Sequence, residues 1–266
     1  MRSMFVAVLV LAFGMSGIPL AHAVDIHGND VQDTYSGVGG LVLPASTEPH
    51  TRREVATCQD CSWQVSDACD TPYGNAFLRC RSDVLRCSSG SEEKRAWMRL
   101  GDGQWHDRGL LCVSSGGPPT VASVGREARG AFVQHLPNLA PSSRPAQGVV
   151  TQLPVIFDSG QPDGTWTFDA AIAGANVHLE AQPRWSWNFG DGSTVTADAP
   201  GGLRLGVGLG HTYRQSGRQT VRVVTRWTAS FWIDGLGPFP VAEEVSQQAA
   251  FSIRVGEGRA ALMEGR

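Results

Sequence analysis

The six cysteines are the residues whose type and spacing bear most directly on chemistry. All lie between positions 58 and 112, and the rest of the chain has none: Cys58, Cys61, Cys69, Cys80, Cys87 and Cys112. A segment this short buries too little apolar surface to fold without cross-links, so an even number of cysteines predicts disulfide bonds. The sequence alone does not choose the pairing.

The spacing Cys58-Gln59-Asp60-Cys61 is also found in two other kinds of site. A zinc site needs a second close pair of ligands, and Cys80 and Cys87 are more widely separated. A thiol redox centre needs the pair to open a helix after a strand, a pattern that the flanking residues do not show. We favour disulfides, with zinc and redox chemistry as alternatives.

Signatures of catalysis are missing from the sequence. Neither G-x-S-x-G nor H-E-x-x-H occurs, and no two histidines lie four residues apart. The pairs Glu92-Glu93 and Glu243-Glu244 are adjacent residues, which is typical of solvated charge. We therefore expect no catalytic residues and no cofactor-binding residues. A hydrolase, or an accessory subunit of one, with a site assembled from residues 58–160 is the alternative.

Composition narrows the class of protein. The 266 residues are 41% hydrophobic and 18% charged, which is typical of a globular protein. Lysine and arginine number 22 against 25 acidic residues, giving a formal net charge of −3. This balance does not favour a protein that binds nucleic acid through its phosphates.

The N-terminus has the pattern of a secretory signal peptide over residues 1–23. Arg2 precedes an apolar run over residues 5–13, and Ala21-His22-Ala23 is a small-x-small cleavage site. The run is too short for a spanning helix, which needs about 20 residues. We expect a mature chain without a transmembrane segment, either secreted or associated with the cell envelope.

The elements that would position these residues follow from composition and periodicity. Residues 24–57 are polar and rich in glycine, so they predict a flexible leader. Residues 58–113 form the expected disulfide-rich module, in which Trp97 and Trp105 flank an Asp-Gly turn and predict a hairpin.

Residues 114–160 predict a linker with one helix and one strand. Apolar residues recur every three or four positions over about 120–135, which predicts an amphipathic helix that ends before Pro137: Val121, Val124, Ala128, Phe132 and Leu136. We expect its apolar stripe to pack on a neighbouring module. Residues 149–157 have the character of a strand.

From residue 161 to 256, short alternating runs separated by glycine and proline predict an antiparallel β-sandwich. Val177, Leu179 and Ala181 should face its core, with His178 and Glu180 outward. Residues 257–266 form a tail. The expected fold class is mainly β, with the sandwich preceded by a small disulfide-rich module and one connecting α-helix.

One motif in this region resembles a known family. The run from Trp187 to Gly192, W-N-F-G-D-G, is followed by His211-Thr212-Tyr213 and then by Gly217. The pattern resembles the PKD domain family over roughly residues 165–256. Asn188 stands where that family usually has aspartate, and Gln219 where it usually has an aromatic residue.

The resemblance implies an immunoglobulin-like sandwich in which the motif is structural. Its members are Trp187, Phe189, Gly190, Asp191, Gly192, His211 and Tyr213. The two aromatic residues of W-N-F would fill the core, the glycines would permit the turn, and the aspartate would cap it. The histidine and tyrosine would tie the facing strand.

Calcium is the one metal that the sequence raises. Asp191 together with Asp163 or Asp234 would supply hard oxygen ligands, although the spacing matches no known calcium loop. We favour a turn aspartate, and hence no metal and no cofactor.

Residues 227–241 exceed the family's minimum and predict an extra hairpin around Asp234-Gly235. Its aromatic residues form the candidate binding patch: Trp227, Phe231, Trp232 and Phe239. Trp232 should face the side opposite Trp227 and Phe231. The alternative is that one face of the hairpin packs against the 120–135 helix or the cysteine module.

The resemblance implies a binding or spacer module that works outside the cell. We therefore expect a secreted, non-catalytic interaction protein whose partner is an extracellular protein or a cell-wall carbohydrate. A purely structural spacer is a further alternative beside the hydrolase.

Overall fold

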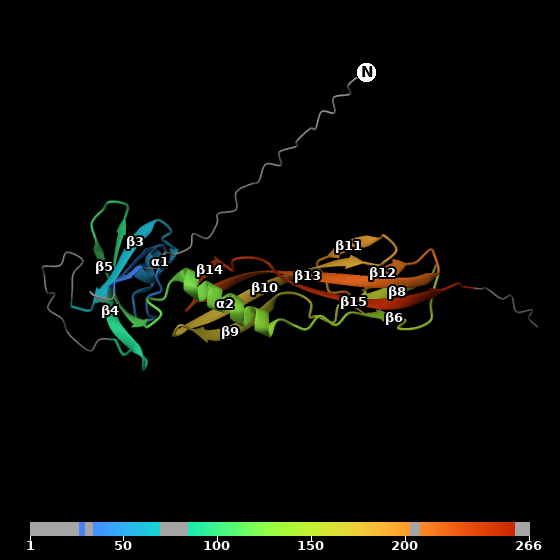
Figure 1. Cartoon of the computed structure of the whole chain (residues 1–266), viewed down its shortest axis with the longest axis horizontal. Helices are drawn as coiled ribbons and strands as arrows, with labels where there is room; N and C mark the ends of the chain where they lie inside the picture. The colour runs from blue at the N-terminus through green and yellow to red at the C-terminus, as the bar shows by residue number, and fades with distance from the viewer. Residues whose placement is uncertain (1–26, 30–33, 70–84, 203–207, 259–266) are drawn as a thin grey trace, which may run out of the picture.

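The computed structural model of the chain describes residues 27–29, 34–69, 85–202 and 208–258. The predicted signal peptide (1–23) lies outside them, as does most of the predicted tail. The described part contains fifteen strands and two helices, which confirms the mainly β fold class. Its strands form a small N-terminal lobe and a long C-terminal body, with helix α2 lying along the body (Figure 1).

The N-terminal lobe is a five-stranded antiparallel sheet with the strands in chain order. Its elements are β1 (His27–Asn29), β2 (Thr34–Val38), helix α1 (Pro49–Thr57), β3 (Cys61–Asp67), β4 (Ser91–Leu100) and β5 (His106–Ser114). Strand β3 alternates as a half-buried strand should, with Trp63 and Val65 fully buried. Leu41, Met98 and Leu111 pack with them in one core.

The prediction of a flexible leader over 24–57 is wrong from residue 34 onward. Strand β2, the buried segment 41–43 and helix α1 all lie there. The glycines that suggested flexibility permit close packing instead, because a Cβ on Gly37 would collide with the Trp63 ring and one on Gly40 with the Ala56 carbonyl. Helix α1 was missed because it buries only Arg52, Val55 and Ala56, too short a stripe for a periodic signal.

Helix α2 (Val121–His135) is the connecting helix. Thr120 caps its start: its hydroxyl accepts from the Ser123 N–H at 3.0 Å, while the Ser123 hydroxyl accepts from the Thr120 N–H. The helix ends before Pro137, and it buries Val124, Ala128 and Phe132 against the body.

The body consists of a seven-stranded sheet and a three-stranded sheet. Its strands are β6 (Ser142–Arg144), β7 (Val149–Val150), β8 (Pro154–Asp158), β9 (Trp166–Ile172), β10 (Ala175–Asn188), β11 (Thr194–Ala197), β12 (Leu209–Thr212), β13 (Gly217–Ile233), β14 (Leu236–Pro240) and β15 (Val245–Gly256). The large sheet runs β11-β10-β13-β15-β7, with β9 added to β10 and β14 to β13. The small sheet runs β12-β8-β6.

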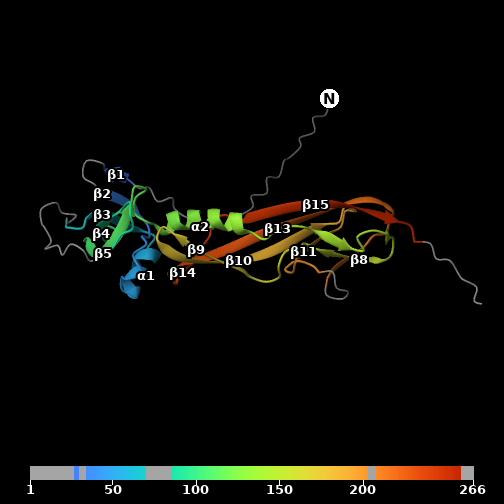
Figure 2. The ribbon, with the colours of Figure 1, turned by 90° about the horizontal axis from the view of Figure 1, so that it is seen from below.

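Strands β10 and β13 are so long that two different elements cover the inner face of the large sheet, one over each half. In one half, the small sheet packs on the large one and forms a sandwich core around Phe157, Trp187 and Tyr213. In the other half, helix α2 packs on the same inner face, around Phe132, Trp227 and Phe231. We call this second half the extension, and Figure 2 shows α2 lying along it.

Candidate functional site

The W-N-F-G-D-G motif lies at the end of strand β10, inside the sandwich half. Trp187 and Phe189 are buried in its core. Gly190 has a φ of 89°, and a Cβ there would lie 2.7 Å from the Thr220 nitrogen, so the turn requires glycine. The Tyr213 hydroxyl donates to the Phe189 carbonyl at 3.1 Å and ties the β12 end to the motif.

Asp191 holds the same turn through its carboxylate. It accepts from the Ser193 N–H at 3.0 Å and contacts His211 Nε2 at 2.8 Å. Burial alone would raise the pKa of Asp191, but these hydrogen bonds outweigh it and lower the pKa. Burial also raises the pKa of Tyr213 well above its usual value. All of these contacts hold the turn in place.

The calcium hypothesis is not supported by the positions of its three aspartates. The Asp191 carboxylate forms hydrogen bonds with Ser193 and His211, while the Asp234 carboxylate accepts from the Asn176 N–H at the far end of strand β10. Asp163 accepts from the N–H of its neighbour Gly164. Within the described residues, no cluster of histidine, cysteine, aspartate and glutamate side chains is suited to a metal.

The hairpin expected over 227–241 is formed by the end of β13 and by β14, but its aromatic residues do not make one patch. Trp227 and Phe231 are 1% and 2% exposed, so both must be removed from the candidate binding patch. They face α2, whose apolar stripe covers the inner side of the extension. Phe239 pairs with Phe231 across the strands and packs against the same core at 5.6 Å between ring centroids. Only Trp232 points to the opposite side.

Trp232 therefore belongs to a different surface, the outer side of strands β9, β10, β13 and β14. We call it the open face, because no described element packs on it: its members are Asp169, Asn176, His178, Glu180, Ser230 and Trp232. Asp169, His178 and Trp232 are directly opposite one another on three successive strands. The Trp232 ring is half-buried, with the Gly237 backbone against one edge and His178 at 5.8 Å.

His178 is held between two carboxylates at the centre of this row. Its Nδ1 lies 2.7 Å from Asp169 Oδ1 and its Nε2 lies 3.5 Å from Glu180 Oε1. The hydrogen bond with Asp169 is the main cause that raises the pKa of His178, and Glu180 adds to it. The open face thus combines an aromatic ring, a titrating imidazole and exposed carboxylates.

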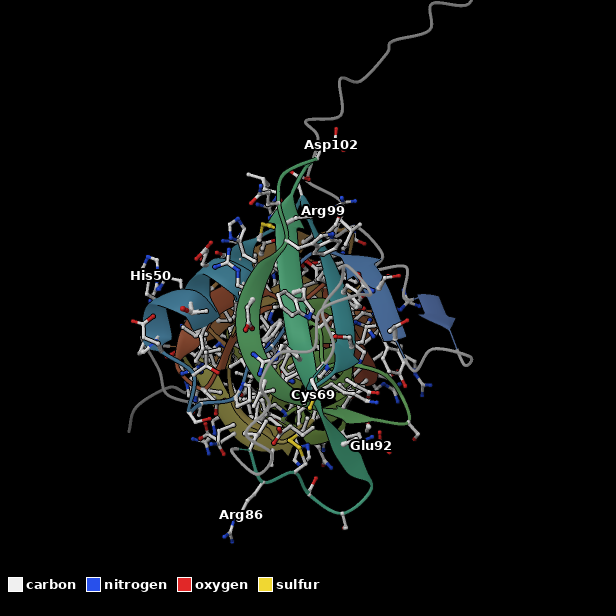
Figure 3. All side chains as sticks on the ribbon, turned by 90° about the vertical axis from the view of Figure 1, so that its left-hand side faces the viewer. His50, Cys69, Arg86, Glu92, Arg99 and Asp102 are labelled. Atoms are coloured by element: carbon white, nitrogen blue, oxygen red, sulfur yellow. A yellow bond between two sulfur atoms is a disulfide. The ribbon has the colours of Figure 1, made fainter. Side chains whose placement is uncertain are left out.

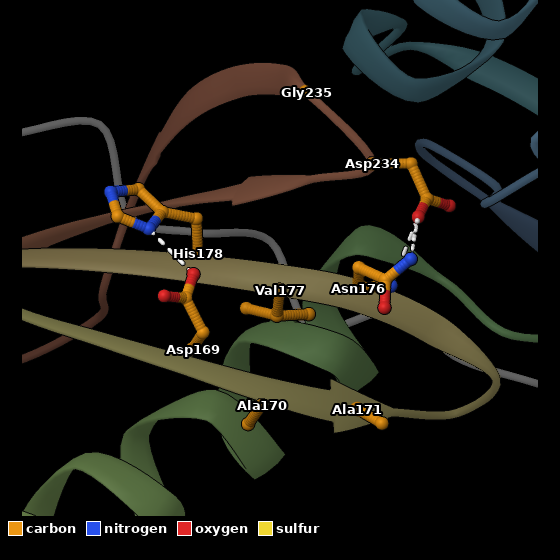
Figure 4. Close-up of a pocket in the computed structure, with 8 residues that line it drawn as sticks. All are labelled: Asp169, Ala170, Ala171, Asn176, Val177, His178, Asp234 and Gly235. Atoms are coloured by element: carbon orange, nitrogen blue, oxygen red, sulfur yellow. Dashed lines mark hydrogen bonds and ion pairs between the residues drawn. The ribbon is translucent and has the colours of Figure 1, made fainter.

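A shallow hollow lies beside this row at the tip of the hairpin (Figure 4). Its polar lining is Asp169, Asn176, His178 and Asp234. Asp234 has a φ of 45°, and its carboxylate accepts from the Asn176 backbone N–H at 2.9 Å. Arg52 of helix α1 donates to the Asp234 carbonyl at 3.2 Å, which connects the N-terminal lobe to this tip.

The sequence identified three members of the open face, Trp232, His178 and Glu180, without connecting the tryptophan with the other two. Asp169 and Asn176 were missed. The alternation Trp166-Thr-Phe168-Asp-Ala170 would have identified β9 as a strand, but its register against β10 depends on the tertiary fold.

The described cysteines are disulfide-bonded, which confirms that expectation and excludes zinc ligation by them. Cys58 pairs with Cys61, and Cys87 with Cys112. Cys69 is also disulfide-bonded, whereas Cys80 lies outside the described residues. Cys58 follows the end of helix α1, where the helix dipole disfavours a thiolate, so the redox alternative gains no support. Figure 3 shows Cys69 and Glu92 toward one end of the sheet and Asp102 at the other.

Carboxylates in the N-terminal lobe are engaged with basic side chains. Lys94, only 3% exposed, contacts Asp67 at 2.7 Å and Glu92 at 3.2 Å. Arg108 forms two hydrogen bonds with Glu54, at 2.7 and 3.1 Å. These ion pairs join neighbouring strands and helix α1 to the sheet, so they stabilise the lobe and do not assemble into an acid–base pair.

No protein-family model matches the chain, and no curated protein matches it. Among the described residues, no helix has the length and apolar character needed to cross a membrane.

Proposed function

We propose that this chain is a secreted, non-catalytic interaction protein that works at the cell exterior or in the cell envelope. It binds a protein or carbohydrate partner through its C-terminal body, which we assign to the PKD-like sandwiches. The signal-peptide pattern and the disulfide bonds support the location. The turn around Gly190 and the Tyr213–Phe189 bond support the family resemblance.

The observation that supports the binding role is the difference between the two faces of the extension: its inner face is covered by a described element and its outer face is not. Helix α2 packs on the inner face, so Trp227 and Phe231 are core residues there. Trp232 lies on the outer face of the same strand, half-buried among polar side chains. Tryptophan is enriched at binding surfaces, and here it is partly accessible beside hydrogen-bonding groups.

The test is a capture experiment with the mature, oxidised protein against the cell-wall fraction and secreted proteins of the producing organism. Trp232→Ala should lose the captured partner while its thermal melt stays cooperative. Trp105→Ala is the matched control, because it removes another half-buried tryptophan that lies in the N-terminal lobe. It should capture as wild type does.

Two results would contradict the proposal. One is capture by wild type that Trp232→Ala leaves unchanged, since the open face would then be uninvolved. The other is no capture from either fraction, which would favour the structural spacer.

A further inference from the structure

A second feature of the large sheet lies beyond the extension, on the outer side of the sandwich half. Five exposed arginines project there from three adjacent strands: Arg184 on β10, Arg218, Arg222 and Arg226 on β13, and Arg254 on β15. Their positions have the opposite parity to Trp185, Val221 and Ile253, which face the buried core. We call these five residues the arginine stripe.

The three arginines of β13 recur every fourth residue. At about 3.3 Å per residue, Arg218 and Arg226 are separated by roughly 26 Å along the strand. β13 runs along the sandwich between β10 and β15 (Figure 1), so the stripe follows the long axis of the body.

The positions of the arginines in the stripe destabilise the folded protein when no partner is bound. Arg218 is directly opposite Arg254, and Arg184 is directly opposite Arg226. Like charges at directly opposite positions of an antiparallel sheet destabilise it. An anionic partner would relieve this repulsion.

Only part of this charge is neutralised within the chain. Arg184 contacts Asp198 at 2.8 Å, and Arg226 contacts Glu244 at 3.3 Å. Among the described residues, Arg218, Arg222 and Arg254 form no ion pair with a carboxylate. Three guanidinium groups therefore present their hydrogen-bond donors to solvent, in the planar arrangement that fits carboxylate and phosphate groups.

The residues between the arginines indicate what kind of anion would fit. They carry mainly hydroxyl and amide groups: Ser186, Thr196, Thr220, Gln248 and Ser252. No aromatic side chain lies among the described residues of this outer surface between Arg184 and Arg254. A protein interface would call for aromatic anchors, and a membrane surface for apolar residues that insert.

We propose that the arginine stripe binds an extracellular polysaccharide that carries carboxylate groups along its length. The guanidinium groups bind the carboxylates, and the intervening hydroxyl and amide groups bind the sugar hydroxyls. This inference rests on the proposed function only for the extracellular location, because it uses none of the residues of the open face.

The experiment measures binding of the mature, oxidised protein to polygalacturonate, with uncharged dextran as the neutral comparison. Wild type should bind polygalacturonate at low ionic strength, lose affinity as salt is added, and ignore dextran. Replacing Arg218, Arg222 and Arg254 together by glutamine should weaken binding by about tenfold or more. The same variant should melt no lower than wild type, because one opposed arginine pair is removed.

A second triple variant controls for net charge. Arg53, Arg86 and Arg126 are also exposed but lie elsewhere on the molecule, so replacing them by glutamine should change affinity by less than about twofold. Equal losses in the two triple variants would overturn the proposal, as would absence of polygalacturonate binding by wild type. Tighter binding to polyglutamate, to anionic lipid vesicles or to duplex DNA would also overturn it.

The two proposals can fail separately. Trp232→Ala should leave polygalacturonate binding unchanged, while the stripe variant should still capture the partner of the open face. Loss of polygalacturonate binding in Trp232→Ala would mean that a single surface serves both, and would overturn the stripe as a separate site.

Discussion

Asp191 illustrates how a single side chain holds the turn that organises the sandwich end. Its carboxylate accepts from Ser193 and contacts His211, whose ring stacks on Phe189 with 4.1 Å between centroids. The residue therefore connects the backbone of the turn to the core aromatic residues. Its neighbour Asn188 uses its side-chain oxygen in the same way, accepting from the Gly190 N–H at 2.9 Å. An asparagine thus makes this turn contact at the position where the PKD pattern usually has aspartate.

Asp191 also makes the stability of the fold depend on pH. Because its pKa is lowered in the folded state, its contribution is present above the unfolded pKa, about 3.9, and is lost as the pH falls through the folded value. Asp191→Asn should destabilise the protein by about 1 kcal/mol at neutral pH. The difference from wild type should shrink below about pH 4, as measured by urea unfolding across pH. Asp198→Asn, at an exposed ion pair with Arg184, is the control and should cost less. A difference for Asp191→Asn that stays constant into strong acid would contradict this role.

At the scale of an element, the hairpin formed by the end of β13 and by β14 shows that the role of a side chain depends on which face of the strand carries it. Successive residues Phe231 and Trp232 point to opposite faces, one under α2 and the other on the open face. Gly125 of α2 lies so close to Phe231 that a Cβ there would be 3.1 Å from its ring. The helix and strand are therefore in direct contact at that point.

We predict that neighbouring substitutions in β13 have very different costs. Phe231→Ala should lower the free energy of unfolding by about 3–5 kcal/mol, because it opens a cavity under α2. Trp232→Ala should cost clearly less, about 1–2 kcal/mol, although it removes the larger side chain. Chemical denaturation of both variants measures this. Equal losses would mean that Trp232 is a core residue, and would remove it from the candidate binding surface.

At the scale of the whole molecule, the two halves of the long sheet are joined by a buried polar network. The Gln161 side-chain oxygen accepts from Trp185 at 2.9 Å and from Thr225 at 2.7 Å. Its nitrogen donates to the Pro137 carbonyl and to Gln247, whose oxygen also accepts from Trp227. Trp185 belongs to the sandwich core and Trp227 to the core under α2, so the network connects the two.

Removing the centre of this network should destabilise both halves together. Gln161→Ala leaves buried donors on Trp185 and Thr225 without an acceptor, which should cost about 3 kcal/mol. Gln182→Ala, on the outer side of β10, is the control and should stay within about 0.5 kcal/mol of wild type. Hydrogen exchange should report faster opening in both β9 and β15 for Gln161→Ala. Faster exchange in one half alone would contradict the coupling.

The N-terminal lobe is joined to the body in a similar way. Val42 packs into the core under α2, and the Val42 N–H donates to the Pro119 carbonyl at 2.8 Å. Arg52, 7% exposed, reaches across to Asp234 at the hairpin tip. These contacts lie at the end of the body where the open face begins, so the lobe supports the strands that carry Trp232 and His178.

Local patterns in the sequence determined several elements of this protein and the faces that they bury. The spacing of Val124, Ala128 and Phe132 identified helix α2, the alternation around Val177 identified the inward side of β10, and the cysteines identified disulfides. These features depend on periodicity and composition within a few residues, so they can be read without knowing the partners. The leader was misjudged because its order depends on tertiary contacts, of Gly37 with Trp63 and of Gly40 with Ala56, that no local pattern shows.

Only the tertiary structure decided which surfaces remain exposed. The sequence places Phe231 and Trp232 on opposite faces, but the position of α2 buries the first and leaves the second on the outer side. Likewise, Arg184 and Arg226, and Arg218 and Arg254, become neighbours through the register of three strands. Strand register and the packing of layers arise from contacts between residues far apart in the chain, which is why local sequence patterns do not reveal them.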